Sequence, residues 1–488
     1  MLQIEDLTVT YNNRPRPAVS SASLTIGKGE FVLLTGDSAS GKSTAMQAVC
    51  GFIPAIVPAK VSGQVRINGK TLRDPMEIAR TVCMVQQDPE TQFCTDTVRE
   101  EVAFGPENFR YSREEVLNAI DTSLKSVGAD HLADRKLSTL SGGEKQKVAI
   151  ASVLALRPEI VILDEPTSSL DPKSVREVIA AIRELGSRST LTTIVVEHRV
   201  ADFLDMATRV VKMQDGRIAS DLLPSEPEFD KIRSELVTSP EYPLLTKRNT
   251  SVMSVQGLSY RIDGNAILSD VTFDVKDGSV VALMGENGAG KTTLLRHISG
   301  LVKPQVGKVS VFDHVIENGE GADPWVIAED VGFVFQNPNH QIFGETVEKE
   351  IGFASVNFRK PEAEARQATD RFAAEEGIDK LSHPNCLSLG QKRRLNIVSS
   401  SAHGPRLLLM DEPFIGQDRT NALKIAEQIA KLQRIGMTVI IVTHDMSFAK
   451  SFCTDVILMS KGKIVATGSP DRVIDGSARE ILEGTSDE

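Results

Sequence analysis

Alternating segments and apolar runs predict the same succession of strands in both halves of the chain. Apolar and polar residues alternate over LQIEDLTVTY (2–11) and SVQGLSY (254–260), which predicts a half-buried strand near the start of each half. FVLLTG (31–36) and VVALMG (280–285) are continuous apolar runs that end in glycine. Runs of this kind are typical of strands that are buried on both faces of a parallel sheet.

Helical spacing follows each of these glycine-ended runs. In STAMQAVCGF (43–52) and TTLLRHISGL (292–301) the apolar residues recur at helical intervals. Two later apolar runs, IVILD (160–164) and LLLMD (407–411), predict further buried strands. Because strands alternate with helices, each half is predicted to be an α/β domain built on a parallel, doubly wound sheet.

The correspondence between the halves extends through their whole length. Lys42 and Lys291 stand 249 residues apart, and His198 and His444 stand 246 residues apart. A repeat with so little drift predicts two large, similar domains rather than the three that a chain of 488 residues suggests by length alone.

Proline density marks the boundary between the two predicted domains. The segment 221–250 has mixed charge and no apolar periodicity, and it contains Pro224, Pro227, Pro240 and Pro243. We therefore expect a first domain over 1–220, a linker over 221–250 and a second domain over 251–488.

Composition excludes several classes of protein. The formal net charge of −11 argues against a general nucleic-acid binder, which carries a basic patch. The five cysteines have no C-x-x-C spacing, which favours a reduced interior over a disulfide framework or zinc site. The N-terminus is expected to be a strand and not a signal peptide, and no apolar stretch is long enough for a membrane-spanning helix.

Two glycine-rich segments match the phosphate-loop pattern G-x-x-x-x-G-K-[ST], each between a predicted strand and a predicted helix. Backbone amides of such a loop and the helix N-terminus bind phosphate. The lysine is expected to reach the β- and γ-phosphates, and the following hydroxyl to hold Mg²⁺. The nucleotide-binding residues predicted here are Gly36, Asp37, Ser38, Ala39, Ser40, Gly41, Lys42, Ser43 and Thr44, and Gly285, Glu286, Asn287, Gly288, Ala289, Gly290, Lys291, Thr292 and Thr293.

Adjacent carboxylates follow the later buried strand of each half. Asp164 and Asp411 close their strands, at the sheet edge where open α/β sheets bind ligands. Each is predicted to anchor Mg²⁺, together with Ser43 or Thr292. Glu165 and Glu412, one residue further on, are predicted to polarise the attacking water.

Phosphate loops, LSGGE (140–144), DEPTSSLD (164–171) and a late histidine together resemble the ATP-binding-cassette family over essentially the whole chain. The resemblance implies two P-loop NTPase domains, each with a mostly parallel sheet core, an antiparallel β subdomain and a helical signature subdomain. In that family two cassettes face each other head to tail, so the chain is expected to be an internal pseudo-dimer of its two halves. Each ATP would then lie between one phosphate loop and the signature segment of the other half.

Carried over residue by residue, the resemblance assigns two composite sites. The first would comprise Lys42, Ser43, Gln87, Asp164, Glu165 and His198, closed by Ser388, Leu389, Gly390 and Gln391. The second would comprise Lys291, Thr292, Gln336, Asp411, Glu412 and His444, closed by Ser141, Gly142, Gly143 and Glu144. Gln87 and Gln336 are expected at Mg²⁺, His198 and His444 at the γ-phosphate, and Asp171 and Asp418 in coupling the sites. Tyr11 and Tyr260 are expected against adenine, with ordinary packing as a nearly equal alternative.

One position distinguishes the signature segments, because Leu389 stands where the first half has Gly142. A leucine keeps the amide but adds bulk and resists backbone angles open to glycine. Either the site closed by Leu389 is slower and regulatory, or the position tolerates side chains; tolerance or modest slowing is favoured, because both glutamates and both histidines remain. Because Leu389 burdens the site built on Lys42 and the site built on Lys291 receives the intact LSGGE, Glu412→Gln is expected to damage turnover more than Glu165→Gln.

The segments after Gln87 and Gln336 resemble one particular group within this family. DPETQF (88–93) and NPNHQIF (337–343), each followed by a TV-x-x-E segment, are similar to the ATPases of energy-coupling-factor importers of vitamins and metal ions. That family implies a transmembrane coupling subunit and a substrate-binding membrane subunit as partners, and a peripheral location on the cytoplasmic face of the membrane. Glu100, Glu101, Glu348 and Glu350 are candidates to pair with arginines of the partner, with an ordinary solvated face as an equal alternative.

Other two-cassette proteins remain as alternatives. A fused sugar-importer ATPase has similar length, but the second cassette of that group usually loses catalytic residues, and Lys291 and Glu412 argue against it. A peptide importer is a further alternative. A translation factor would need a long charged helical linker. A DNA-repair cassette would need long coiled coils or zinc-binding cysteines. Neither set of features is seen in this sequence. The solute stays open: a vitamin, a thiamine pyrimidine precursor, or cobalt or nickel.

Overall fold

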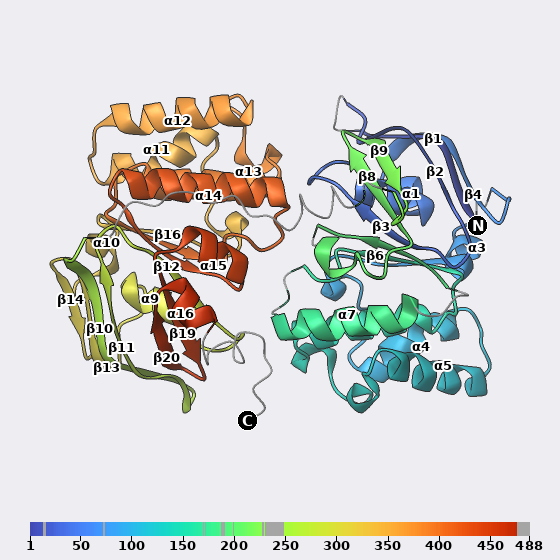
Figure 1. Ribbon diagram of the computed structural model, residues 1–488, viewed down its shortest axis with the longest axis horizontal. Helices are drawn as coiled ribbons and strands as arrows, with labels where there is room; N and C mark the ends of the chain where they lie inside the picture. The colour runs from blue at the N-terminus through green and yellow to red at the C-terminus, as the bar shows by residue number, and fades with distance from the viewer. Residues whose placement is uncertain are drawn as a thin grey trace. The chain divides into compact units, whose positions relative to one another are not determined.

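The computed structural model describes residues 1–12, 16–71, 74–168, 170, 172–186, 191–198, 200–226, 229 and 248–475. The chain divides into two compact units, Met1–Thr238 and Ser239–Glu488. Much of the linker expected over 221–250 lies outside the described residues, and strand β9 continues two residues into it, to Leu222. Each unit is an α/β domain with a mostly parallel sheet and a separate antiparallel sheet (Figure 1).

The first unit is built on a six-stranded sheet in the order β5-β6-β7-β3-β8-β9. All neighbours are parallel except β8 and β9, which form an antiparallel pair at the edge. A three-stranded antiparallel sheet in the order β2-β1-β4 accompanies it. The strands are β1 (Leu2–Tyr11), β2 (Val19–Ile26), β3 (Phe31–Thr35), β4 (Ala59–Ile67), β5 (Val82–Val85), β6 (Ile160–Asp164), β7 (Thr192–Val196), β8 (Arg209–Gln214) and β9 (Arg217–Leu222).

The core of the first unit lies on both faces of its central sheet: helices pack on one face, and the antiparallel sheet with the helix after the phosphate loop packs on the other. All residues of β3, β6 and β7 are buried, which is why these strands are continuous apolar runs in the sequence. The helices are α1 (Lys42–Val49), α2 (Phe52–Ala55), α3 (Pro75–Thr81), α4 (Val98–Asn108), α5 (Arg113–Ser126), α6 (Gly142–Leu154) and α7 (Pro172–Gly186), with 3₁₀ turns η1 (Pro89–Thr91), η2 (Asp130–Leu132), η3 (Leu137–Thr139) and η4 (Val200–Asp202). The predicted helical signature subdomain corresponds to α4, α5 and α6, which share one hydrophobic core.

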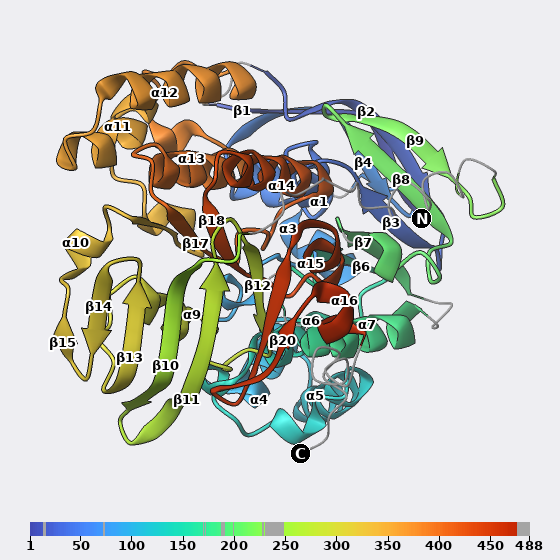
Figure 2. The same cartoon turned by 60° about the vertical axis from the view of Figure 1, so that its left-hand side comes forward.

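The second unit repeats this plan. Its central sheet has the order β16-β17-β18-β12-β19-β20, and its antiparallel sheet the order β11-β10-β13-β14-β15 (Figure 2). The strands are β10 (Ser251–Ile262), β11 (Asn265–Lys276), β12 (Val280–Gly285), β13 (Val306–Val311), β14 (His314–Glu317), β15 (Glu320–Gly321), β16 (Val331–Val334), β17 (Leu407–Asp411), β18 (Thr438–Val442), β19 (Asp455–Ser460) and β20 (Lys463–Gly468).

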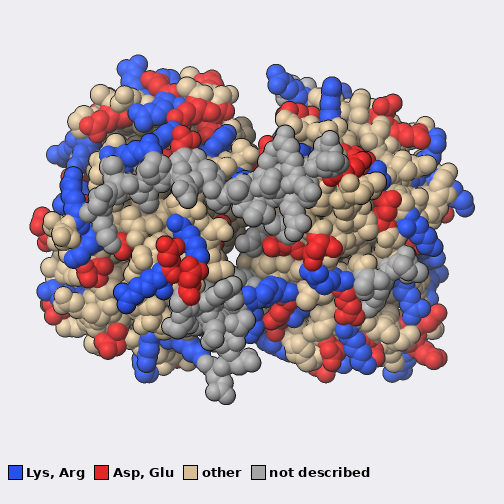
Figure 3. Space-filling model, in the orientation of Figure 1, with Lys and Arg blue, Asp and Glu red and all other residues tan. Residues whose placement is uncertain are grey.

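The helices of the second unit follow the same order as those of the first. They are α9 (Lys291–Ile298), α10 (Pro324–Ile327), α11 (Val347–Asn357), α12 (Glu362–Glu376), α13 (Leu389–Ser401), α14 (Arg419–Arg434), α15 (Met446–Phe452) and α16 (Pro470–Ile474), with η5 (Pro338–His340) and η6 (Pro384–Cys386). Within the described ranges, no helix is both long and apolar enough to cross a bilayer. Positive and negative side chains are interspersed over the face seen in Figure 3.

Candidate functional site

The phosphate loop of the first unit joins buried strand β3 to helix α1. Gly36 and Gly41 have φ angles of 144° and 99°, in the region that favours glycine. A Cβ atom on Gly36 would lie 2.1 Å from the carbonyl oxygen of Met213, so no other residue fits there. Ala39 also has a positive φ of 63°, which costs an alanine about 1–2 kcal/mol. Ala39 therefore adopts a left-handed conformation like that of Gly288 in the second unit, which has a φ of 81°.

Both loop lysines are buried and held by the loops themselves. Lys42 is 4% exposed, and its Nζ donates to the carbonyl oxygens of Gly36 and Asp37, at 2.9 Å each. Lys291 is 6% exposed and donates in the same way to Gly285 at 2.8 Å and Glu286 at 2.9 Å. Each loop thus presents a fixed ammonium group at the N-terminus of its helix, where a phosphate is stabilised.

A hydroxyl and a buried carboxylate meet beside each loop. Ser43 Oγ donates to Asp164 Oδ1 at 3.0 Å, and Thr292 Oγ1 donates to Asp411 Oδ2 at 2.9 Å. Burial raises the pKa of Asp164 to about 6, and it raises that of Asp411 as well. A hydroxyl and carboxylate oxygen suit Mg²⁺, which takes few protein ligands and relies on phosphate oxygens and water.

The next residue on each strand end is the predicted catalytic glutamate. Glu165 and Glu412 have φ angles of 48° and 51°, a strained conformation for a side-chain-bearing residue. His198 Nε2 lies 2.8 Å from Glu165 Oε1, and His444 Nε2 lies 2.7 Å from Glu412 Oε1. The structure therefore brings each predicted histidine to the glutamate of its own unit.

The predicted glutamines follow the edge strands of the two central sheets. Gln87, just after β5, donates its Nε2 to Glu165 Oε2 at 2.6 Å. The first unit therefore joins glutamine, glutamate and histidine in one hydrogen-bonded group. Gln336 follows β16 at the corresponding place. Within the described residues, no set of three His, Cys, Asp or Glu side chains is arranged to hold a metal ion alone.

The signature segments begin helices α6 and α13 and are closed by capping boxes. Ser141 Oγ accepts from the amide of Glu144, whose side chain accepts from the amide of Ser141 in return. Ser388 and Gln391 form the same pair in the second unit. Leu389 occupies the first helical position and is 43% exposed. Asp171 lies outside the described residues, whereas Asp418 caps α14 by accepting from Asn421 N at 2.7 Å.

The two predicted adenine-stacking tyrosines are anchored differently. Tyr11 shares a hydrogen bond of 3.0 Å with the hydroxyl of Thr44, which follows the phosphate loop. Tyr260 meets His297 edge to face, with ring centroids 4.7 Å apart. Both tyrosines are therefore fixed to the helix that starts at their own phosphate loop.

Three of the four carboxylates expected to face arginines of a partner have roles within the chain. Glu101 is 5% exposed, and its Oε2 accepts from the amides of Cys94 at 2.9 Å and Thr95 at 3.1 Å. Glu350 is 3% exposed and accepts from the amides of Phe343 and Gly344. Glu100 completes the capping box of α4. The interpretation of Glu101 and Glu350 as partner-facing groups is wrong, because their oxygens hold the loops that follow Gln87 and Gln336.

Sequence reasoning missed Glu197, which precedes His198. This carboxylate is 2% exposed, and it accepts from Thr167 N at 3.1 Å, from the Thr167 hydroxyl and from His198 N at 2.8 Å. It thus joins the loop after β6 to the end of β7. The signal in the sequence was the contrast with Thr443, since a glutamate in an apolar run needs buried donors.

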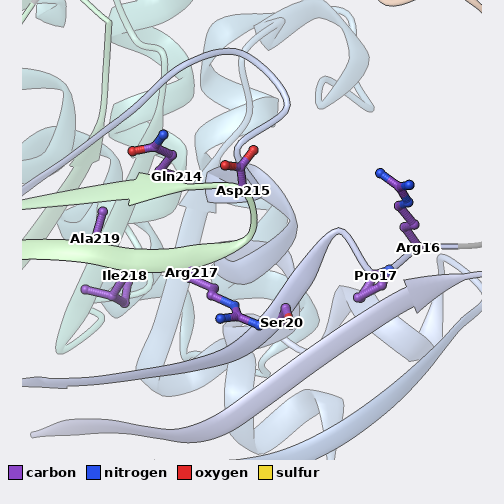
Figure 4. Close-up of a pocket in the computed structure, with 8 residues that line it drawn as sticks. All are labelled: Arg16, Pro17, Ser20, Gln214, Asp215, Arg217, Ile218 and Ala219. Atoms are coloured by element: carbon purple, nitrogen blue, oxygen red, sulfur yellow. The ribbon is translucent and has the colours of Figure 1, made fainter.

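A pocket of about 550 Å³ was also not predicted (Figure 4). It lies between the start of β2 and the β8–β9 hairpin, lined by Arg16, Pro17, Ser20, Gln214, Asp215, Arg217, Ile218 and Ala219. The hairpin residue Gly216 donates its amide to Ser40 O at 3.0 Å, so the pocket adjoins the back of the phosphate loop.

Sequence similarity to known proteins extends over almost the whole chain. A family model described as "ABC transporter" matches residues 19–168 and 268–415. A Methanosarcina mazei protein named "Putative ABC transporter ATP-binding protein" is 34% identical over 540 residues, covering 99% of this chain and 90% of that protein. The Bacillus subtilis "Putative HMP/thiamine import ATP-binding protein YkoD" is 33% identical over 507 residues, covering 96% of this chain and 92% of that protein.

Among solved structures, cbiO1 from Clostridium perfringens, described as part of the ABC transporter complex cbiONQ, is 32% identical with a TM-score of 0.41. The match covers 47% of this chain and 92% of cbiO1.

Proposed function

This chain belongs to the ABC transporter family, and on that premise we propose that it energises a membrane importer of the energy-coupling-factor type. Members of the family hydrolyse ATP to drive transport, so the chain is an ATPase of a transporter. The proposal concerns the kind of transporter, its solute and the residues that act. We propose uptake of a vitamin or vitamin precursor, such as a thiamine pyrimidine, or of cobalt or nickel.

Two observations support this type of importer. The Bacillus subtilis relative, which aligns over nearly the whole chain, carries HMP and thiamine import in its name. The second observation is the structure of the Q-x-P-x-x-Q segments. Gln92 Oε1 accepts from Gln86 N at 3.2 Å, and Gln341 Oε1 accepts from Phe335 N at 3.1 Å, so the second glutamine fixes each loop to its edge strand.

The loop fixed in this way exposes apolar side chains in the second unit. Phe343 is 60% exposed and meets Phe353 of α11 with ring centroids 4.4 Å apart. Val356, one turn further along α11, is 66% exposed. We propose that these three side chains, with Phe104 on α4, contact the coupling segments of the transmembrane partner. An exposed apolar cluster on a rigid loop and helix is typical of a protein interface.

The nucleotide sites are proposed to be composite. Each phosphate loop would bind ATP together with the signature serine of the other unit, with Mg²⁺ held by Ser43 and Asp164 in one site. When bound, Mg²⁺ neutralises phosphate charge and orients the terminal phosphate for attack. Glu165 and Glu412 would accept a proton from the attacking water, and the histidine bonded to each glutamate would fix its carboxylate.

Hydrolysis would drive transport through two states of the chain. ATP binding stabilises the closed arrangement of the units and hydrolysis releases it, because the nucleotide binds the two arrangements with different affinity. The exposed side chains of Phe343, Phe353 and Val356 would transmit the change between these two arrangements to the partner. On this proposal the chain is peripheral to the cytoplasmic face of the membrane.

The test uses cells that carry the importer and the full chain. Lys42→Ala combined with Lys291→Ala is expected to abolish uptake of the labelled solute, while Phe343→Ala with Phe353→Ala should lower membrane co-purification and leave ATPase activity near the wild-type value. Mass spectrometry of co-purified membrane proteins identifies the partner. Uptake that survives loss of both lysines, or co-purification with ribosomes instead of membranes, would refute the proposal.

A further inference from the structure

The first glycine of the signature motif, Gly142, is replaced by Leu389 in the second unit, and the surroundings of the two positions explain the replacement. In the first unit, an ideal Cβ atom on Gly142 would lie 3.2 Å from Leu170 Cδ2. Leu170 follows Asp164 by six residues, on the loop between β6 and α7, and it packs on the core of its unit. The tip of Leu170 therefore fills the space beside the first turn of α6.

In the second unit the leucine belongs to the signature helix α13 and not to the loop that follows the strand. Leu389 stands at the position of Gly142, and its Cδ2 lies 4.0 Å from where a Cβ atom on Gly416 would be. Gly416 is on the loop between β17 and α14, and Gln417, six residues after Asp411, takes the place of Leu170. Each unit thus has one leucine side chain where the signature helix meets this loop, and Leu389 is 43% exposed there.

The next glycine of the motif shows why only the first can vary. A Cβ atom on Gly143 would lie 2.6 Å from Ser174 Cβ, and one on Gly390 would lie 2.8 Å from Asn421 Cγ. Both distances are too short for a side chain, because the neighbours belong to a packed helix turn. Among the described residues, the atom that meets a Cβ on Gly142 is the end of the flexible Leu170 side chain, so a residue is possible there once that side chain is removed.

We infer that Leu389 is a positioning residue that replaces Leu170, supporting the loop between β17 and α14 from the signature helix. Leu389 then stabilises the site it helps to form and does not impair it. Gln417 fits this exchange, since its Oε1 is buried without a hydrogen-bond partner among the described residues and an apolar side chain would be better accommodated there. The packing exchange holds without the proposed function, but its effect on turnover rests on the proposed composite sites, in which Leu389 closes the site of the other unit.

The experiment is a double-mutant cycle in the full chain, read by kcat, KM for ATP and thermal unfolding. Leu389→Gly is expected to lower kcat about three- to tenfold with KM unchanged, and Leu389→Gly with Gln417→Leu should recover most of this loss. Leu389→Met, which keeps the apolar contact, should retain kcat. In the first unit, Gly142→Leu should be more harmful alone than combined with Leu170→Gln.

The outcomes show whether Leu389 supports its site or impairs it. A higher kcat for Leu389→Gly would mean that the leucine is a defect, and an unchanged kcat would mean that it positions nothing; either result overturns the inference. A double variant no better than Leu389→Gly also overturns it. Failure of transport by a chain whose ATPase shows the predicted coupling would refute only the proposed importer.

Discussion

A buried ion pair on the signature helix of the second unit allows a stability prediction with a matched control. Arg394 of α13 binds Glu376 of α12 through two hydrogen bonds of 2.6 Å each. The two side chains are only 4% and 6% exposed. Arg394 also donates to Asn421 at 2.5 Å, and Asn421 binds Asp418, so the pair continues into the loop after β17.

Glu376→Gln is expected to destabilise the second unit by about 3–5 kcal/mol, because it leaves a buried guanidinium without its counter-charge. For a unit of this size, the loss lowers the Tm of its transition by about 6–20 °C. Replacing both partners, with Arg394→Met and Glu376→Leu, should recover much of the loss, since no unpaired charge then remains.

The assay is urea unfolding of the full chain, followed by probes that report each unit separately. Glu177→Gln in the first unit is the control. Its partner is Lys147, which follows Ser141 by six residues as Arg394 follows Ser388. Glu177 is 42% exposed and the Lys147 side chain is 9% exposed, so water partly screens this pair and the loss of Glu177 should cost less than the loss of Glu376. Equal losses for Glu376→Gln and Glu177→Gln would show that burial does not decide the strength of these pairs.

Three further predictions concern turnover and pH. If Leu389 supports its site, Glu165→Gln and Glu412→Gln should lower steady-state ATPase equally; a greater loss from Glu412→Gln, the result that the sequence alone favours, would contradict that packing role. Glu197→Gln should cost about 1–3 kcal/mol of stability in urea unfolding and lower kcat more than it changes KM, because a buried acceptor is replaced by a donor; unchanged stability and kcat would argue against its role. Burial lowers the pKa of His297, so the stability that its neutral form contributes is present above its unfolded pKa and lost as pH falls; the Tm of the second unit should fall more steeply below about pH 6.5 than in His297→Leu, and parallel Tm profiles would refute this.

The sequence predicted the parts of the fold that depend on local pattern. Buried strands such as β6 and β17 are continuous apolar runs, and the phosphate loops have glycines where the backbone demands them. The presence of two α/β domains with an additional antiparallel sheet is confirmed. The roles of the site residues in ATP hydrolysis remain predictions.

Contacts between distant segments were not predictable in the same way. The sequence does not show whether a carboxylate on a helix faces solvent or the amides of a preceding loop, so Glu101 and Glu350 were misinterpreted. Nor does it show that Leu170 ends beside Gly142, since the contact joins residues from two different elements. Comparing the two halves position by position would have identified Glu197, because its counterpart is Thr443.

The positive φ angles of Glu165 and Glu412 affect which substitutions are favoured during evolution of the sequence. A glycine or asparagine at either position would relax the backbone, so folding favours loss of the glutamate that the proposed chemistry needs. A variant with glycine or asparagine at Glu165 or Glu412 is therefore expected to be more stable than the active chain. Two active cassettes in one chain would then persist only while transport itself is under selection.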